Sequence, residues 1–287
     1  MIWVIYSLIS AFSWATADAF TKRISSSIDD YIITLSRFLY SSPFVLILLF
    51  FIPIPKLDGL FWLVLSIALL IEAIAWILYV KAIRNSNLSL VAPLLSLTPV
   101  FLVFTSFMIL GELPTIVGFF GILLVVIGAY ILNIKDIKRG VIEPFKSVLK
   151  EKGCVYMIIA AFLFSITSNL GKILVQKSSP LFFSAIYLPL LAISFIIIAF
   201  FVSRKKITQL KSDFKSFFFI GLFFGLMTIF HMLAIRMVIV PYMISIKRTS
   251  SIFSVLYGYF LFKEKGIKER SIGAVIMLIG AGLIILF

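Results

Sequence analysis

Ten apolar stretches, each long enough to cross a bilayer as a helix, follow one another along the chain. A hydrocarbon core of roughly 30 Å is crossed by about 20 apolar residues in helical form. Hydrophobic residues make up 62% of the chain and charged residues only 13%, which is too little polar surface for a water-soluble fold. We therefore expect a protein in a lipid bilayer, with spans near residues 2–22, 32–54, 60–82, 88–110, 114–134, 153–175, 180–202, 216–236, 239–262 and 269–287.

The spans are expected to be helices. Lipid cannot satisfy backbone amides, so only helices and closed barrels cross membranes, and barrel strands show alternating segments of about ten residues. The continuous Leu, Ile and Phe runs of this chain do not alternate in that way. The sequence predicts an all-α integral membrane protein with ten transmembrane helices.

The basic residues indicate the orientation of the spans. A formal net charge of +14 suggests nucleic acid for a soluble domain, but here the charges lie between spans, so no nucleic-acid partner is expected. Nineteen of the 26 Lys and Arg residues fall in odd-numbered connections and four in even-numbered ones. The positive-inside rule then places the odd connections in the cytoplasm and both termini outside the cell membrane. The basic stretch Lys135 to Lys152, which includes the connecting loop 139–152, is expected to lie along the anionic leaflet.

Several function classes are disfavoured. The N-terminus lacks a basic region and a small-residue cleavage site, so the first stretch is expected to remain as a helix. Cys154 is the only cysteine, which excludes an intramolecular disulfide. With one His, one Cys and no clustered carboxylates inside the spans, the sequence predicts neither an enzyme nor a metal site or other cofactor.

The chain contains an internal repeat. Each copy has five spans, an odd number, so the second copy must enter the membrane from the opposite side. We expect two inverted five-helix repeats, 1–138 and 153–287, on either side of the connecting loop. An offset of 152 residues needs no gap, and an offset of 150 aligns the first and sixth spans. The matched positions include Arg84 on Arg236, Glu112 on Glu264, Gly121 on Gly273, Gly128-Ala129 on Gly280-Ala281 and, at the smaller offset, Lys22 on Lys172.

Two segments of the chain contain a specific pattern of residues. They run from Ser89-Leu90-Val91-Ala92 through Leu97-Thr98-Pro99 to Leu110-Gly111-Glu112, and from Ile246-Lys247-Arg248-Thr249-Ser250-Ser251 to Phe262-Lys263-Glu264. Both resemble the EamA-type members of the drug/metabolite transporter superfamily. The resemblance implies tandem five-helix repeats around a central cavity lined by helices one, three, four, six, eight and nine. Relatives usually have both termini in the cytoplasm, whereas the charges of this chain predict the reverse, and we follow the charges.

Polar residues inside the spans are the candidate site. Glu72 lies twelve residues into the third span, about 18 Å along its axis and close to the midplane. Trp76 and Tyr79, at i+4 and i+7, share its helix face. The offset of 152 maps Trp76 and Tyr79 onto Thr228 and His231 of the eighth span. These residues are expected to line a cavity, although aromatic and His side chains also simply bond across helices.

The ninth span contains two adjacent cations, Lys247 and Arg248. Adjacent helical residues point about 100° apart, so only one is expected to face a given cavity. One of them is a candidate partner for Glu72, and long cations near a helix start also reach toward the membrane surface. At least one is expected to bind substrate or to control access to it.

The first two spans hold further ionisable groups. Asp18 shares a face with Trp14 and Lys22 through i, i+4 spacing, so an ion pair with Lys22 competes with a proton-carrying role. Arg37 lies near the start of its span and is expected to reach the membrane surface. In the sixth span, Ser165, Thr167, Ser168 and Asn169 either line a cavity or bond between helices.

The function that these features favour is secondary transport. We expect an exporter or exchanger of a small organic metabolite, such as an amino acid or a related solute, working by alternating access around a midplane site. Glu72 and Asp18 are the candidates for coupling to protons. The alternative is a lipid-linked substrate flippase or a non-transporting membrane assembly partner.

Overall fold

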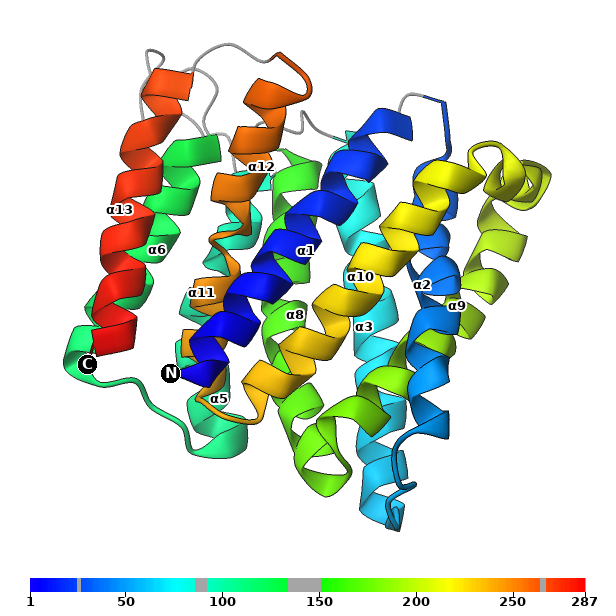
Figure 1. Ribbon diagram of the computed structural model, residues 1–287, viewed down its shortest axis with the longest axis horizontal. Coiled ribbons are helices and arrows are strands. Elements are labelled where there is room, and N and C mark those ends of the chain that lie inside the picture. Colours follow the sequence, from blue (N-terminus) through cyan, green and yellow to red (C-terminus); the bar gives the residue numbers. More distant parts are fainter. Residues whose placement is uncertain (25–26, 86–91, 134–150, 264–266, 287) are drawn as a thin grey trace.

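The computed structural model describes residues 1–24, 27–85, 92–133, 151–263 and 267–286, and the regular secondary structure of these residues is entirely helical (Figure 1). Apart from its last two residues, the basic connecting loop 139–152 lies outside this part of the chain. The first half contains α1 (Ile2–Ile24), α2 (Asp30–Leu46), η1 (Ile47–Phe50), α3 (Gly59–Asn85), η2 (Ala92–Leu97), α5 (Thr98–Leu110) and α6 (Ile116–Asn133). The second half contains α8 (Lys152–Lys177), α9 (Pro180–Val202), η4 (Arg204–Lys211), α10 (Phe214–Ile235), α11 (Val240–Lys247), α12 (Ser250–Phe260) and α13 (Ile267–Leu286).

Six helical segments are long and apolar enough to cross a membrane, which confirms the expected class for most of the chain. They are Ile2–Ile24, Asp30–Phe50, Gly59–Ile83, Lys152–Lys177, Pro180–Val202 and Phe214–Ile235. Shorter apolar helices cover Leu94–Leu110, Ile116–Leu132 and Ser271–Leu286. The predicted span 239–262 is not one continuous helix, because α11 ends at Lys247 and α12 starts at Ser250.

The outer surface of the helices is apolar. Phe50, Phe51, Leu70 and Phe201 are each at least 67% exposed. Contiguous exposed apolar surface of this kind is unfavourable in water and favourable against lipid chains. The helix surface therefore fits the bilayer that the composition predicted.

Short polar residues define several helix starts. The side chain of Asp29 accepts a hydrogen bond from the backbone N–H of Tyr31 at the start of α2, and Asp213 does the same for Ser216 in α10. Ser179 accepts from Phe182 and precedes Pro180, whose fixed φ suits the first helical position of α9. These caps satisfy backbone donors that a helix start leaves free.

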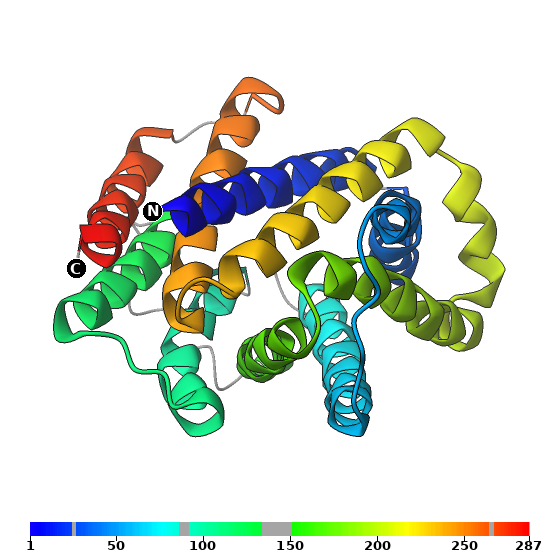
Figure 2. The same cartoon turned by 60° about the horizontal axis from the view of Figure 1, so that its bottom comes forward.

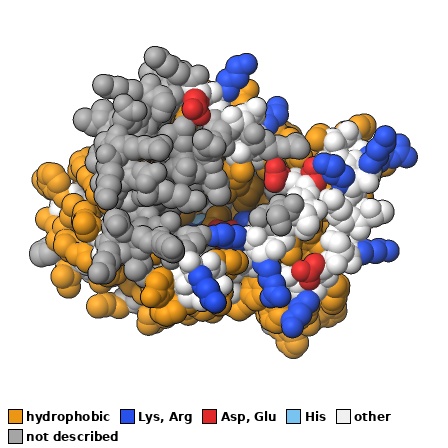
Figure 3. All heavy atoms as spheres, turned by 90° about the horizontal axis from the view of Figure 1, so that it is seen from above, with side chains coloured by type: hydrophobic (Ala, Val, Ile, Leu, Met, Phe, Trp, Pro, Cys, Tyr) orange, Lys and Arg blue, Asp and Glu red, His pale blue; other side chains and the backbone are white. Residues whose placement is uncertain are grey.

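The chain alternates between the two ends of the molecule. In Figure 1 the ends of α1, α3, α9 and α12 lie toward the top, whereas α3, α6 and α9 start toward the bottom. The connection between α9 and α10 belongs to the upper end. Its exposed cations are Arg204, Lys205, Lys206 and Lys211, and Lys215 follows in the first turn of α10. Figure 3 looks onto this end and shows Lys and Arg side chains gathered there.

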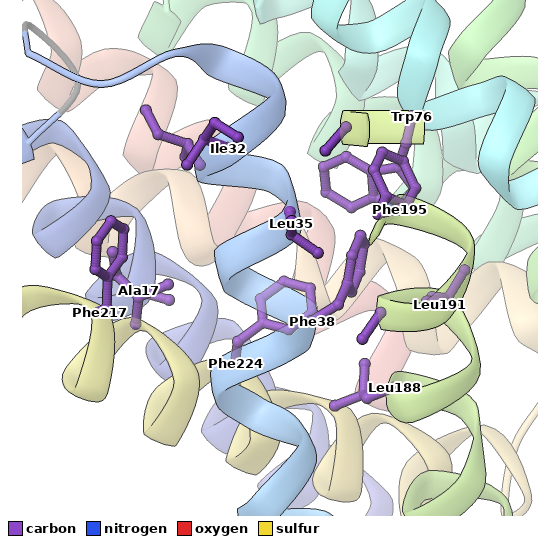
Figure 4. Packing of buried hydrophobic residues seen from close by; sticks show 14 of the residues in the cluster. Ala17, Ile32, Leu35, Phe38, Trp76, Leu188, Leu191, Phe195, Phe217 and Phe224 are labelled. Carbon is purple, nitrogen blue, oxygen red and sulfur yellow. The ribbon is translucent and has the colours of Figure 1, made fainter. Parts of the chain in front are cut away.

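Helices from the two halves of the chain pack against each other. α1 lies along α10 and α3 lies along α8 (Figures 1 and 2). α2 packs on α9, and α6 on α13. Phe38 of α2 is the centre of the largest apolar cluster, with its ring 5.5 Å from that of Trp76, 5.2 Å from that of Phe195 and 5.8 Å from that of Phe224 (Figure 4). This cluster joins five helices, because it also contains Ala17 and Ile24 of α1.

Glycines allow α6 and α13 to approach closely. A Cβ atom at Gly121 would lie 2.8 Å from the carbonyl oxygen of Gly280, and one at Gly128 would lie 2.6 Å from that of Gly273. Because the lower-numbered glycine of one helix faces the higher-numbered glycine of the other, the two helices run antiparallel. Small residues at such crossings bring backbones together in membranes.

Candidate functional site

A cavity of about 120 Å³ lies between helices from both halves of the chain. Eight aromatic side chains line it: Trp14, Phe38, Trp76, Tyr79, Phe164, Phe183, Tyr187 and Phe224. The polar side chains in the wall are Glu72, Thr98, Thr167, Ser168, Thr228, His231, Lys247, Arg248 and Ser250. An apolar pocket with a few converging polar groups is the usual form of a small-molecule site.

The structure brings together most of the residues that the sequence singled out. Eight of the nine candidates line this one cavity: Trp14, Glu72, Trp76, Tyr79, Thr228, His231, Lys247 and Arg248. Asp18 is not among the described residues of the wall. Sequence reasoning missed Phe38, Phe183 and Tyr187 because aromatic residues are frequent in every span, and their spacing did not distinguish them.

Glu72 is buried and held by donors from two other side chains and its own helix. The indole Nε1 of Trp76 donates to its carboxylate at 3.2 Å, consistent with the shared helix face that the i+4 spacing predicted. The hydroxyl groups of Thr167 on α8 and Tyr187 on α9 also interact with it. Three neutral side chains therefore surround the carboxylate. The predicted ion pair between Glu72 and a cation of the ninth span is wrong, because no described Lys or Arg forms one with it.

Lys247 lies between His231 and Trp14. Its Nζ is 3.0 Å from His231 Nδ1 and 4.6 Å from the centre of a Trp14 ring. When Lys247 is an ammonium group it can only donate, and His231 then accepts at Nδ1. The indole face stabilises the cation through its electron density.

Arg248 connects the break between α11 and α12 to the start of α5. Its Nη2 donates to Thr98 Oγ1 at 2.9 Å, and Thr98 is the first residue of α5, directly after η2. Arg248 itself lies in the turn between α11 and α12. The expectation that only one of Lys247 and Arg248 faces the cavity is wrong, because the helix ends between them and both line the wall.

The first two spans form a different ion pair from the one considered. Arg37 is only 8% exposed, and its Nη2 lies 2.7 Å from Asp18 Oδ1. The prediction that Arg37 reaches the membrane surface is therefore wrong, because a carboxylate on the neighbouring helix holds it inside. Lys22, the other candidate partner of Asp18, has its Nζ 4.6 Å from the centre of the Phe262 ring.

The polar residues of α8 have two roles. Asn169 accepts from Ser106 at 2.7 Å and donates to Thr105 at 3.0 Å, and Thr105 donates to Ser165 at 3.2 Å. These bonds fasten α8 to α5. Thr167 and Ser168, on another face of the same helix, line the cavity. Both alternatives for this segment therefore apply, to different residues.

A buried ion pair closes the contact between the halves at the lower end of the molecule. Lys172 of α8, 5% exposed, pairs with the carboxylate of Glu112 and donates to the carbonyl oxygen of Val238 at 2.7 Å. The second Glu112 oxygen accepts from the backbone N–H of Val240 at 3.0 Å. The Glu112 carboxylate thus links the segment after α5 to α8 and to the start of α11.

Comparison with known families decides the class of the protein. The family model described as the EamA-like transporter family matches residues 1–134 and again residues 151–286. The chain belongs to the EamA-like transporter family. This EamA-like protein is therefore a transmembrane transporter of the drug/metabolite transporter superfamily, with the family pattern present twice.

Structural comparison supports the fold of this EamA-like protein. A solved crystal structure of another protein matches it with a TM-score of 0.79 at 14% sequence identity. The match covers 99% of this chain and 97% of the other. Comparison with curated proteins finds no match. A match at this level of identity shows a shared fold and does not identify a substrate.

Proposed function

We propose that this protein is a secondary transporter, an exporter or exchanger, of a small organic metabolite such as an amino acid or a related solute. Transport proceeds by alternating access around the cavity described above. The observation that carries the proposal is that one cavity, with charged groups near the middle of the spans, is lined by helices of both family matches. Intramembrane charges of this kind usually mark a substrate path.

We further propose that the chain crosses the membrane ten times, in two inverted five-helix repeats. The antiparallel α6 and α13 support this, because the offset of 152 relates them as copies. The cross-contacts support it as well, since α1 packs on α10 as its counterpart α8 packs on α3. A twofold axis in the membrane plane produces such reciprocal contacts.

In this proposal the protein lies in the plasma membrane with both termini outside. The basic upper end then faces the cytoplasm. Two single-cysteine variants in a Cys154→Ala background test the orientation, at exposed positions of opposite ends, Leu113→Cys and Ser212→Cys. A membrane-impermeant maleimide added to intact cells is expected to label Leu113→Cys and not Ser212→Cys. The opposite pattern contradicts the orientation, and labelling of both contradicts the alternate crossings.

The size of the cavity supports a small solute over a lipid-linked one. At roughly 10–15 Å³ for each water-sized group, a volume of about 120 Å³ holds about eight to twelve such groups. An amino acid fits this size, whereas the headgroup of a lipid-linked sugar does not. A flippase or an assembly partner remains the outcome of the test if no soluble solute is transported.

The test is flux into liposomes that contain the purified protein. A thermal-shift screen against amino acids, nucleotides, sugar phosphates and organic cations selects the solutes, and counterflow of each radiolabelled hit measures transport. Empty liposomes are the control. Uptake that depends on the protein supports the proposal, and stabilising solutes that never cross the membrane contradict it.

Proton coupling is tested with the same liposomes. If Glu72 or Asp18 carries the coupling proton, the amide variant Glu72→Gln or Asp18→Asn loses the pH dependence of flux while exchange is retained. Unchanged pH dependence in both variants removes proton coupling through these carboxylates.

A further inference from the structure

The cavity wall contains more cationic than anionic side chains. Lys247 and Arg248 are its Lys and Arg residues and Glu72 is its carboxylate, among the residues that the structure describes. Neither cation forms an ion pair within that part of the chain. The ion pairs found there join Arg37 to Asp18, Lys172 to Glu112, Lys177 to Asp58 and Lys206 to Asp29.

The hydrogen-bonding capacity of the two cations is incompletely used. Arg248 has five N–H donors, of which Nη2 donates to the Thr98 hydroxyl. Its buried Nε has no hydrogen-bond partner. Lys247 has three donors and a polar contact with His231 alone among side chains, besides the Trp14 ring. A buried donor without an acceptor is unfavourable, so this side of the cavity fits a ligand that supplies acceptor oxygens.

Glu72, in contrast to the two cations, already has hydrogen-bonding partners within the protein. Its carboxylate already accepts from Trp76 and interacts with the hydroxyls of Thr167 and Tyr187. Its negative charge acts favourably on Lys247 without forming an ion pair. The wall therefore holds two basic side chains and one carboxylate. One carboxylate on the ligand makes the two numbers equal, whereas a phosphate with two negative charges exceeds this balance.

We propose that the transported solute is a monocarboxylate, with or without a second polar group, whose carboxylate lies between Arg248 and Lys247. This inference rests on the proposed transport function and names its substrate class. The guanidinium fork matches the two oxygens of a carboxylate. The aromatic side chains of the wall, including Phe38, Trp76 and Phe224, contact the apolar part of a ligand of about ten non-hydrogen atoms in all.

Matched probes of nearly equal size test the charge requirement. The first set shares a phenyl ring and has four head groups: 3-phenylpropionate, 3-phenylpropanamide, 3-phenylpropylamine and phenyl phosphate. The second set is octanoate and octanamide, which replace the ring by a chain. Binding to purified protein is measured by thermal shift and isothermal titration. A carboxylate of at least one set is expected to bind about 10- to 100-fold more tightly than its neutral amide, the effect of charged hydrogen bonds.

Variants locate the carboxylate. Arg248→Gln is expected to remove most of this preference, and Arg248→Lys to restore part of it by keeping the charge. Arg236→Gln is the matched control, because Arg236 is exposed in the connection between α10 and α11 and is absent from the cavity wall. Since Arg248 also bonds Thr98, its variants are checked for folding by size-exclusion chromatography. Lys247→Gln and the probe series on the unmodified protein give the answer if Arg248→Gln does not fold.

The outcomes separate this inference from the transport proposal. The inference is overturned if amides or amines bind as tightly as carboxylates, if no carboxylate binds, or if phenyl phosphate binds more tightly than all of them. It is also overturned if Arg248→Gln folds and keeps the preference. Liposome flux of amines without flux of carboxylates retains transport and rejects the anion site. Arg248-dependent carboxylate binding without any flux retains the site and rejects transport.

Discussion

Arg37 of α2 donates to the carboxylate of Asp18 on α1 at 2.7 Å, and the same nitrogen lies 3.2 Å from the Thr21 hydroxyl. The guanidinium also lies 5.9 Å from the centre of the Phe224 ring on α10. One cation thus joins three helices. A charge that is buried in this way depends on its partner, because the partner's removal leaves it without compensation.

Asp18→Asn is expected to lower the free energy of unfolding by about 1.5–3 kcal/mol, the size of a charged hydrogen bond. The lower part of this range applies because the Asp18 side chain is 37% exposed and water screens it. The double variant Asp18→Asn with Arg37→Gln is expected to lose less than the sum of the single variants. Thermal unfolding in detergent measures the three values, and strict additivity contradicts the coupling.

The contact between α6 and α13 predicts the effect of a single methyl group. In Gly128→Ala the new Cβ lies 2.6 Å from the Gly273 oxygen and from Met277. Overpacking of this kind costs about 1–3 kcal/mol, and here the neighbour is backbone, which cannot rotate away. Gly282→Ala on α13 is the control, because no atom lies within 4 Å of its Cβ. That variant is expected to be neutral or slightly stabilising. Equal melting temperatures for the two variants contradict the close contact.

The Glu112 carboxylate is expected to control access to the cavity from the lower end. Glu112→Gln removes its charge and weakens the link from Lys172 to the connection before α11. The readout is alkylation of Ser168→Cys, a cavity position, in a Cys154→Ala background. If the pair favours the closed end, the labelling rate rises about 10-fold, the factor for 1.4 kcal/mol.

The matched control is Lys177→Gln, which breaks an exposed pair with Asp58 at the same end. Exposed pairs contribute little, so its labelling rate is expected to match that of the parent. If the Glu112 and Lys177 variants are labelled equally fast, the buried pair does not control access.

Asp29, outside the spans, predicts a pH dependence of stability. Burial by itself raises the pKa of the Asp29 carboxyl, but hydrogen bonds from Lys206, Ser203 and the Tyr31 amide outweigh it and lower the pKa below 3.8. A carboxyl with a lowered pKa stabilises the fold above its unfolded pKa, and this contribution is lost as the pH falls through the folded pKa. The protein is therefore expected to lose stability below a pH of about 4.

Asp29→Asn tests this dependence. The variant is expected to be less stable than the parent at neutral pH by about 1.5–3 kcal/mol and to show a smaller loss on acidification. Melting temperatures between pH 7 and pH 3 measure both effects. Asp58→Asn is the control, since its partner Lys177 and its own side chain are partly exposed, and little change is expected. A parallel pH profile for Asp29→Asn and the parent excludes Asp29 as the source.

Most of the helical architecture could be read from the chain because its causes are local. Apolar runs of about 20 residues select helices in lipid, and six segments have the length and composition expected. The contact between Glu72 and Trp76 follows from helical spacing, which does not depend on the rest of the fold. The glycines that recur at a constant offset indicated the repeat, and the structure adds that they lie where α6 and α13 approach.

Pairing between helices required the folded molecule. Asp18 is four residues from Lys22 and nineteen from Arg37, yet the ion pair forms with Arg37, because packing sets the rotation and depth of α1 and α2. Arg248 and Thr98 are 150 residues apart and meet where two helices break. Helical spacing decides which side chains share a face. The neighbour that each face meets is set by the packing of all the helices together, so the charges that remain unpaired at the cavity could be recognised only in three dimensions.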